Sequence, residues 1–347
     1  MTVLQQAWHQ RNALSIVLRP LSWCYRLLFM LRRWAYRSGL KHVYHVGVPV
    51  IVVGNISVGG TGKTPLVIWL VESLRTAGYK PGIVARGYRG KAKHWPQQVR
   101  PDSDPVIAGD EAVLLAARSR CPVAVAPKRV EAAQALLTHH DCNIIISDDG
   151  LQHYALGRDI EIAVIDGIRR FGNGFCLPAG PLREPVHRLN SVDYIVVTEG
   201  GAMQREHMMR LIAERLVSVR DAEQSCTAER LGSRRVHAVA GIGNPRRFFM
   251  QLRRMGLEVV EHPFPDHHDF TAGDLQFAES LPLIMTEKDA VKCRRFAADN
   301  WWYLPVSAEV DDKLKSDLLQ QLRTLDHLRD SQAQSDLEEN QKGTRYG

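Results

Sequence analysis

The feature that most constrains this 347-residue chain is a glycine-rich turn between a predicted strand and a predicted helix. An apolar run at 48–53 predicts a buried strand, and the turn GNISVGGTGKTP follows it from Gly54 to Pro65. Glycines let successive backbone N–H groups point at phosphate oxygens, and the helix that follows presents its positive N-terminal end. In such a P-loop Lys63 reaches the β- and γ-phosphates and Thr64 ligates Mg²⁺. We therefore expect a nucleoside triphosphate, ATP with Mg²⁺, at this turn.

The turn departs from the usual P-loop pattern at one position, because Ser57 stands where the first glycine is expected. Gly59 and Gly60 can restore the backbone freedom that a glycine would give. Pro65 is tolerated in the first helical turn, where its missing N–H would be unpaired. The alternative is a purely structural turn. The predicted nucleotide-binding residues are Ser57, Val58, Gly59, Gly60, Thr61, Gly62, Lys63 and Thr64.

Short β-rich runs alternate with helical patterns along most of the chain. This alternation predicts an α/β fold of the P-loop NTPase type, with a mainly parallel sheet flanked by helices. The predicted strands of the first part are 48–53, 82–85, 123–126, 144–147, 160–165 and 194–198. A polar stretch at 220–235 then precedes a second, smaller α/β pattern. It contains strands at 236–240, 258–261, 283–286 and 301–306 and a helix at 245–255.

The expected organisation has four parts. A basic amphipathic helix at 1–40 precedes the P-loop domain at 41–230, the smaller C-terminal α/β lobe at 231–328 and a polar, disordered tail at 329–347. The six cysteines are scattered, with neither metal-ligand spacing nor a disulfide framework. Their pattern indicates a reducing compartment and argues against a structural zinc site.

The N-terminal segment is strongly basic, because no Asp or Glu precedes Glu72, while the whole chain has a net charge of +7. Arg19, Arg26 and Arg33 recur every seven residues. A stripe of large apolar residues at helical spacing contains Trp23, Leu27, Met30 and Trp34. The interleaved arginines exclude a spanning helix and argue against a cleaved signal peptide. The segment predicts an interfacial membrane helix, and a helix packed on the protein's own core is the alternative.

A second motif, NIIISDDG at 143–150, is an apolar strand that ends in two carboxylates. In a P-loop fold such a strand places an acid beside Mg²⁺ at the carboxyl edge of the sheet. Asp148 and Asp149 point in opposite directions if both stay extended, so either of them could meet the metal directly. An ordinary strand followed by an acidic turn is the alternative.

The P-loop alone suits a kinase, a GTPase or a membrane-recruited partitioning ATPase. A GTPase would need an Asn-Lys-x-Asp motif, which is absent, and Ser57 replaces the signature lysine of the partitioning ATPases. The ordered motifs of the chain resemble those of the tetraacyldisaccharide 4'-kinase family, from the N-terminal helix to about residue 325. The matching motifs are 54–65, ARGYRG at 85–90, AGDEA at 108–112, SDDGLQH at 147–153, GNGFCLPAGPLRE at 172–184, FPDHHDFT at 264–271 and TEKDAVK at 286–292.

This resemblance implies transfer of the γ-phosphate of ATP to the 4'-hydroxyl of tetraacyldisaccharide 1-phosphate, which gives lipid IVA in lipid A biosynthesis. It implies a lipid substrate at the cytoplasmic face of the inner membrane, which would explain a basic, aromatic N-terminal helix. A membrane-recruited ATPase switch and a nucleic-acid-binding protein remain as other hypotheses. The arginines lie among tryptophans and leucines and no nucleic-acid motif occurs, so we expect no nucleic acid partner and no obligate protein partner.

The resemblance also implies roles for individual residues. Asp110 would act as the general base toward the sugar hydroxyl, and an N-cap role is its alternative. His267, or less favourably His268, would orient this base, raise its proton affinity and make activity depend on closure of the two lobes. A surface histidine in a turn is the alternative for His267.

The remaining predictions concern phosphate, sugar and metal contacts. Asn55, Gln152 and His153 match family positions near the sugar and the phosphates, and Arg129 and Arg183 are candidate anchors for the substrate phosphate. The predicted metal site contains Thr64, Asp148, Asp149 and Glu184. Arg86 and Arg89 are expected to screen the charge of the nucleotide or the substrate.

Overall fold

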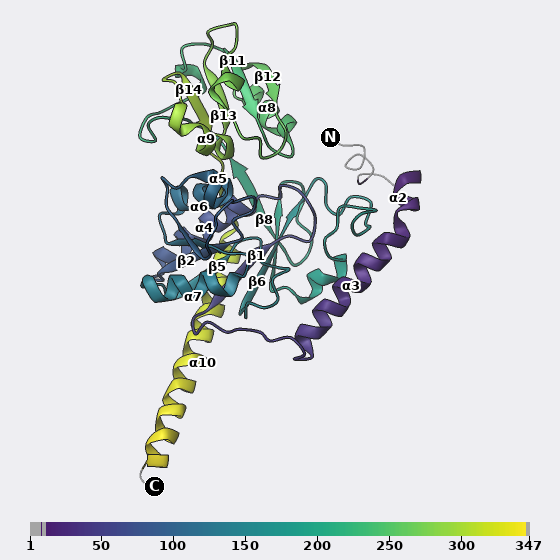
Figure 1. Ribbon diagram of the computed structural model, residues 1–347, viewed down its shortest axis with the longest axis vertical. Helices are drawn as coiled ribbons and strands as arrows, with labels where there is room; N and C mark the ends of the chain where they lie inside the picture. The colour runs from purple at the N-terminus through teal and green to yellow at the C-terminus, as the bar shows by residue number, and fades with distance from the viewer. Residues whose placement is uncertain (1–7, 9–11, 345–347) are drawn as a thin grey trace.

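The computed structural model describes residue 8 and residues 12–344, with the backbone alone from residue 332 onward. The chain forms a large α/β lobe, a smaller α/β lobe above it, and two long helices beside and below the large lobe (Figure 1). The large lobe contains β1 (Val50–Gly54), α4 (Lys63–Thr76), β2 (Pro81–Ala85), β3 (Gln97–Val99), α5 (Pro105–Ala108), α6 (Asp110–Ser119), β4 (Val123–Val125), α7 (Arg129–His139), β5 (Ile144–Ser147), β6 (Ile160–Asp166), β7 (Tyr194–Thr198) and β8 (Glu206–Ile212).

The large sheet has nine strands in the order β15-β8-β7-β6-β1-β5-β2-β4-β3, in which β15 (Ser307–Val310) comes from the C-terminal part of the chain. All neighbours from β8 to β4 are parallel, and β15 and β3 are antiparallel strands at the two edges. The predicted parallel α/β sheet is therefore confirmed. Because the carboxyl ends of parallel strands share one edge, the loops after β1, β2, β5 and β6 meet there.

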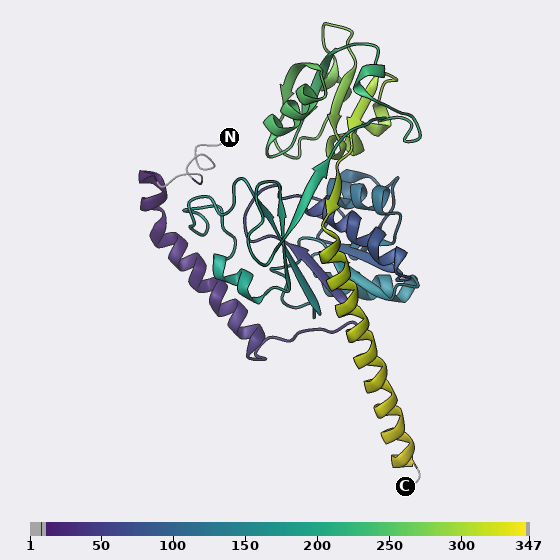
Figure 2. The same ribbon diagram turned by 180° about the vertical axis from the view of Figure 1, so that it is seen from behind.

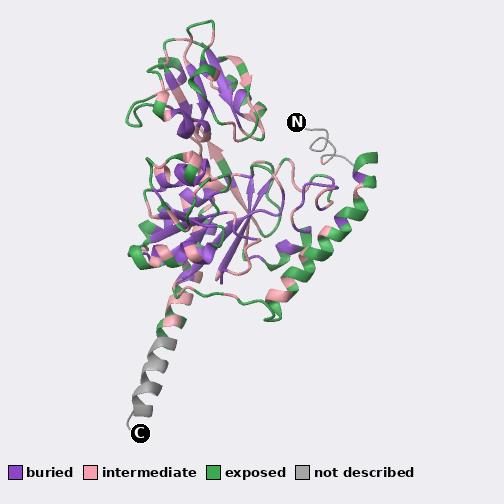
Figure 3. Cartoon of the chain, in the orientation of Figure 1, coloured by how far each residue is buried: buried purple, intermediate pink, exposed green. Residues whose placement is uncertain are grey.

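Alternating side chains of β1 build the cores on the two faces of this sheet. Ile51 and Val53 pack with α4, α6 and the C-terminal helix on one face, whereas Val50 and Val52 pack with α7 on the other. Figure 3 shows the buried strands between partly exposed helices. A buried strand with helices on both faces explains why the run at 48–53 is apolar at every position.

The small lobe has a six-stranded sheet in the order β10-β9-β14-β13-β11-β12. Its elements are β9 (Leu216–Ser218), β10 (Ser225–Cys226), β11 (Arg235–Ala240), α8 (Pro245–Arg254), β12 (Glu258–Pro263), β13 (Leu283–Thr286), α9 (Glu287–Cys293) and β14 (Trp301–Leu304). The predicted strands and helix of the second α/β pattern all occur here. Strands β9 and β10, which sequence analysis missed, add an antiparallel edge.

The predicted boundaries 41–230 and 231–328 differ from the observed lobes. The chain enters the small lobe after β8 and returns through β15 (Ser307–Val310), which pairs with β8 in the large sheet. Helix α10 (Asp312–Thr344) then places Leu314, Leu318 and Leu322 in the core of the large lobe. The small lobe is therefore an insertion between β8 and β15. Burial of these leucines stabilises the return of the chain to the large lobe.

The expected disorder at 329–347 is wrong for the residues that the structure describes, because α10 continues to Thr344. The first turns of α10 are anchored on the core, and extending an existing helix is much easier than nucleating one. The polar sequence beyond them is rich in Gln, Glu and Lys, which have good helix propensity. Residues 345–347 lie outside the described part.

Two helices represent the N-terminal segment: α2 (Ala13–Val17) and α3 (Arg19–Arg37), with Pro20 in the first turn of α3. Of the predicted segment 1–40, residues 1–7 and 9–11 lie outside the described part. Seen from behind, α3 runs along the flank of the large lobe, on the far side of its sheet from α10 (Figure 2). Among the described helices, none has a stretch long and apolar enough to cross a membrane.

Candidate functional site

The phosphate loop connects β1 to α4, and its backbone explains where glycine is required. Gly59 has a φ of 114° and Gly62 a φ of 88°, which is the left-handed region that disfavours other residues. Ser57 instead forms an antiparallel bridge with Leu182, an extended conformation open to any residue. The missing first glycine therefore does not disturb the loop. Gly62 leaves the N-terminus of α4 without a side-chain cap, so its first N–H groups are available to an anion.

Asn55 supports the loop from beneath. Its side chain is fully buried, and its Nδ2 donates to the carbonyl of Gly59 and to Oγ1 of Thr61, both at 3.3 Å. Both of these donations stay within the phosphate loop, and a contact of Asn55 with the substrate stays a prediction. A polar side chain after a strand suggests an exposed contact, but here it holds the turn in shape.

Asp149 forms ion pairs that join the phosphate loop to the segment between β6 and β7. Its carboxylate lies 3.5 Å from Nζ of Lys63 and 3.0 Å from Nη1 of Arg183. Burial alone would raise the pKa of Asp149, but these two cations lower it to about 2. Lys63 is thus held at the loop by a carboxylate that stays ionised.

Asp148 has the opposite electrostatic environment. Burial and the nearby charge of Glu111 raise its pKa to about 7, and the atom Oδ1 is buried without a hydrogen-bond partner. An unpaired, buried carboxylate oxygen at this edge of the sheet fits a cation ligand. Thr64 begins the same helix as Lys63, so Thr64, Asp148 and Asp149 form a donor set suited to Mg²⁺, which often uses few carboxylates together with substrate phosphates. Within the described residues, no group of three or more His, Cys, Asp or Glu side chains could hold a metal by itself.

Glu184 does not belong to this donor set. It is fully buried, and its oxygens are contacted by Gln152, by Oη of Tyr154 at 3.1 Å and by Nε of Arg188 at 3.1 Å. Glu184 is thus a buried counter-ion of Arg188, and these contacts do not favour its predicted role as a metal ligand. The amide nitrogen of Gln152 also donates to the carbonyl of Asn55 at 3.1 Å, so its donors are used within the protein rather than on a sugar.

The two arginines predicted to anchor a substrate phosphate differ. Arg129 is 2% exposed and donates to the carbonyls of Ala126 and Asp148, which does not favour a contact with the substrate phosphate. Burial lowers the pKa of Arg129 to about 10. Arg183 is partly exposed beside Asp149 and remains a candidate anchor.

His153 lies in the loop after β5, and its side chain is half-buried. Burial and then the charges of Arg129 and Arg86 lower its pKa to about 3, so it is a neutral imidazole at physiological pH. A neutral ring can accept a hydrogen bond as well as donate one, which suits contact with sugar hydroxyls.

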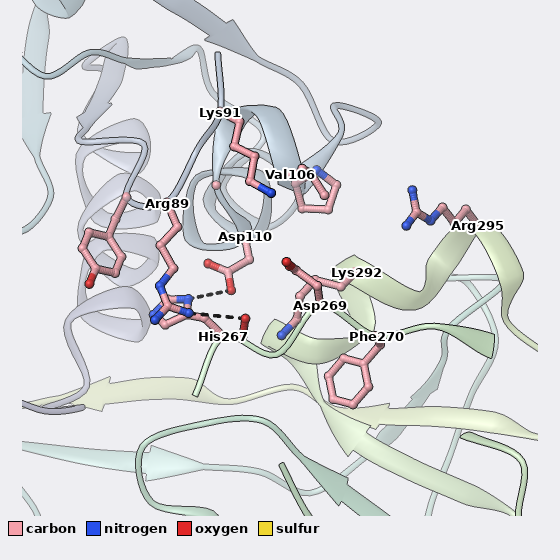
Figure 4. A pocket seen from close by; sticks show the side chains of 12 residues that line it. Arg89, Lys91, Val106, Asp110, His267, Asp269, Phe270, Lys292 and Arg295 are labelled. Carbon is pink, nitrogen blue, oxygen red and sulfur yellow. Dashed lines mark hydrogen bonds and ion pairs between the residues drawn. The ribbon is translucent and has the colours of Figure 1, made fainter. Parts of the chain in front are cut away.

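Asp110 begins α6, where it faces His267 of the small lobe (Figure 4). The helix cap is Gly109, so the N-cap alternative for Asp110 is wrong. Its Oδ1 accepts from the N–H of Glu111 at 2.8 Å, and Oδ2 lies 3.0 Å from Nδ1 of His267. His268 instead contacts Asp274 at 3.4 Å, so the structure selects His267 as the partner.

The effect of His267 on the proton affinity of Asp110 is opposite to the expectation. Burial raises the pKa of Asp110, but the hydrogen bond from His267 and the charge of Lys288 outweigh it, so the pKa lies below its ordinary value. Asp110 is therefore an ionised carboxylate at neutral pH. An ionised carboxylate can accept a proton from a hydroxyl, as a general base must.

A pocket of about 280 Å³ opens beside this pair, between the lobes (Figure 4). Arg89 enters it after β2 and donates to the carbonyl of Asp266 at 3.2 Å, while Arg86 lies exposed in the same loop. Three further basic side chains line the pocket and escaped sequence analysis: Lys91, Lys292 and Arg295. Lys292 is paired with Asp289 at 2.7 Å, so the positive charge that suits a phosphorylated ligand comes from Lys91 and Arg295.

Arg169 is another residue that sequence analysis missed. Its Nη2 donates to the carbonyl of Gly60 at 2.7 Å, and Asp166 at the end of β6 holds its Nε at 2.9 Å. A guanidinium thus lies against the phosphate loop. The signal available in the sequence was a strand ending in an acid followed by two arginines, at 166–170.

Comparison with known proteins places the chain in one family. The family model for tetraacyldisaccharide-1-P 4'-kinase matches residues 14–323. The chain is 51% identical to the tetraacyldisaccharide 4'-kinase of Nitrosococcus oceani, covering 93% of this chain and 95% of that protein. It is 52% identical to the enzyme of the same name from Methylobacillus flagellatus, covering 93% and 96%.

Among solved structures, the "apo" form of LpxK from Aquifex aeolicus in complex with ATP is similar, with a TM-score of 0.75 and 27% identity. The match covers 89% of this chain and 99% of that chain. The residues that the family model matches include the phosphate loop, Asp110 and His267. The chain belongs to the tetraacyldisaccharide-1-P 4'-kinase family.

Proposed function

We propose that the protein transfers the γ-phosphate of ATP to the 4'-hydroxyl of tetraacyldisaccharide 1-phosphate, giving lipid IVA in lipid A biosynthesis. The observation that carries this proposal is the contact between Asp110 and His267 beside a basic pocket. An ATPase that acts only as a switch needs a phosphate loop and a metal site. A kinase needs in addition a base that faces an acceptor, and Asp110 is suited to this role.

In the proposed reaction, the carboxylate of Asp110 accepts the proton of the 4'-hydroxyl while the sugar oxygen attacks the γ-phosphorus. The bond from that phosphorus to the bridging oxygen breaks, and ADP leaves. Lys63 and the N-terminus of α4 bind the phosphate oxygens, and Arg183 neutralises charge nearby. Mg²⁺ held by Thr64 and by Asp148 or Asp149 would neutralise the charge of the β- and γ-phosphates. His153 is proposed to contact the sugar.

Label transfer tests the reaction directly. The protein is incubated with γ-labelled ATP, Mg²⁺ and tetraacyldisaccharide 1-phosphate in detergent, and the lipid is separated and counted. Label in the lipid is expected. Asp110→Asn should lower kcat by about 100- to 10,000-fold, because it removes the base, and should leave ATP binding intact. Release of labelled phosphate without labelled lipid would favour the switch ATPase instead.

We also propose that α3 lies in the membrane interface, at the cytoplasmic face of the inner membrane. Its inner side is tied to the large lobe: Oγ of Ser22 donates to the carbonyl of Cys176 at 2.8 Å and Oη of Tyr25 to that of Arg183 at 3.0 Å. The opposite side is apolar, and within the described residues Leu21, Trp23, Leu27, Leu28, Leu31 and Trp34 are exposed there. A helix packed on the protein's own core would bury these side chains.

The arginines of α3 support this proposal, because interfacial helices combine apolar area with charges that reach lipid phosphates. Sedimentation with liposomes that contain anionic lipid tests it. Leu28 is 68% exposed on α3, and Leu328 is 62% exposed on α10, so Leu28→Glu and Leu328→Glu are a matched pair. We expect Leu28→Glu to weaken sedimentation and Leu328→Glu to leave it unchanged. Equal sedimentation of both variants and of a protein that lacks residues 1–36 would contradict the proposal.

A further inference from the structure

Lys288 lies where the two lobes meet, next to the paired Asp110 and His267. It belongs to α9 of the small lobe, and its side chain is only 16% exposed. Its Nζ is 3.1 Å from Oε1 of Glu111 on α6 and 3.2 Å from Nε2 of His267. One ammonium group thus contacts an acid of the large lobe and the histidine of the small lobe.

The chemistry of the ammonium fixes the hydrogen positions on His267. A lysine ammonium has three donors and no acceptor, so at Nε2 it must donate and the ring nitrogen must accept. The ring hydrogen is then on Nδ1, which donates to Oδ2 of Asp110. A doubly protonated ring would direct an N–H at the ammonium. Lys288 therefore selects the neutral Nδ1–H form of His267.

The surrounding charges keep Lys288 protonated. Burial lowers the pKa of Lys288, but the acids Glu111, Asp110 and Asp266 outweigh burial and raise it. His267 also has Tyr88 beside its ring at 5.5 Å and Arg89 at its carbonyl. The titratable and charged groups around His267, taken over all the elements packed against it, are Tyr88, Arg89, Asp110, Glu111, Asp266, Lys288 and Lys292.

We propose that Lys288 is a positioning residue for phosphoryl transfer, which holds His267 in its Nδ1–H form and joins it to Glu111 across the lobes. His267 then donates the hydrogen on Nδ1 to Asp110, and this hydrogen bond holds one carboxylate oxygen of the base in place. This inference rests on the proposed function for its consequence in catalysis. The state of His267 itself is a property of the folded protein and does not depend on which reaction occurs.

Three variants test the role of Lys288. Lys288→Met keeps the length of the side chain and removes its charge and donors. Lys288→Cys, alkylated with 2-bromoethylamine, restores an ammonium at nearly the same position, and wild-type protein treated in the same way controls for the other cysteines. Arg118→Met is the matched control, because Arg118 pairs with Glu287 at 2.8 Å in another ion pair between α6 and α9 that does not touch His267.

The first readout is the ¹⁵N spectrum of protein labelled at histidine, with His267 assigned from its loss in His267→Gln. In the wild type and in Arg118→Met, we expect an unprotonated Nε2 and a protonated Nδ1 at neutral pH. In Lys288→Met the Nε2 signal should move toward the protonated position, and alkylated Lys288→Cys should return it. An unchanged His267 spectrum in Lys288→Met would overturn the inference, even if the protein proved to have no kinase activity.

The second readout is label transfer to the lipid. Lys288→Met should lower kcat by about 10- to 100-fold with little change in the KM for ATP, because the base is misplaced while the phosphate loop is untouched. The alkylated variant should recover most of this loss. A full kcat in Lys288→Met, or a loss that the restored ammonium does not recover, would refute a positioning role. Wild-type protein that transfers no label would instead refute the proposed function.

Discussion

Asp148 gives a prediction in which removal of a functional residue stabilises the protein. In the unfolded chain its carboxyl has the ordinary pKa of 3.8, and in the folded, metal-free protein burial raises the pKa to about 7. A raised pKa favours the protonated form. The contribution of Asp148 to the free energy of unfolding is therefore complete below pH 3.8 and is lost as the pH rises to about 7. One pKa unit corresponds to about 1.36 kcal/mol, so at pH 8 the loss is on the order of 4 kcal/mol.

Asp148→Asn removes this titration and keeps the shape of the side chain. We expect its free energy of unfolding to exceed that of the wild type by about 4 kcal/mol at pH 8 and by roughly 1–2 kcal/mol at pH 5. Urea denaturation in the presence of EDTA at the two pH values measures both differences. Addition of Mg²⁺ and ATP should stabilise the wild type. The Asp148→Asn protein should lack kinase activity.

Asp149→Asn provides the matched control with the opposite sign. The pKa of Asp149 is lowered to about 2, so its stabilising contribution is complete above pH 3.8 and is lost only as pH falls through about 2. This variant should be less stable than the wild type, by the same amount at pH 5 and pH 8. An Asp148→Asn protein whose stability relative to the wild type is equal at both pH values would refute the reasoning.

Three further predictions follow from buried or charged groups. Lys63→Ala should lower transition-state stabilisation by several kcal/mol, about 3 or more, and near-normal label transfer would contradict its role. Leu318→Ala should destabilise the large lobe by about 2–5 kcal/mol in urea denaturation, because this side chain is 1% exposed in its core. Arg188→Met should be destabilising by about 3–5 kcal/mol, since it removes the guanidinium that Glu184 and Glu161 share, and a second substitution, Glu184→Gln, should recover part of the loss.

The parallel sheet was predictable from sequence because its central strands are buried on both faces. Strands β5 and β7 have the predicted bounds 144–147 and 194–198, since each is a continuous apolar run. Strand β8 reads EHMMRLI and β15 reads SAEV, and neither run is continuously apolar. Strand β8 forms because it pairs with β7, and β15 forms because it pairs with β8. These partners are distant in sequence, so the runs themselves do not predict the strands.

The phosphate loop and the pairing of Asp110 with His267 were predicted, because motifs specify residue types at fixed spacing. Asn55, Arg129 and Glu184 have buried partners within the protein that could not be predicted, because a motif does not reveal whether a polar side chain faces a ligand or a buried partner. Lys288 illustrates the reverse case. It lies within the recognised motif at 286–292, yet its role depends on His267 and Glu111, which are distant in sequence.

The insertion of the small lobe has a consequence for synthesis on the ribosome. The sheet that carries the phosphate loop is incomplete until β15 has been made, and its core until Leu322 has emerged. Strands β1 to β8 are therefore synthesised first, and about a hundred residues of the small lobe are translated before β15 can complete the sheet. A polypeptide that stops anywhere before α10 would expose the apolar face meant for those leucines.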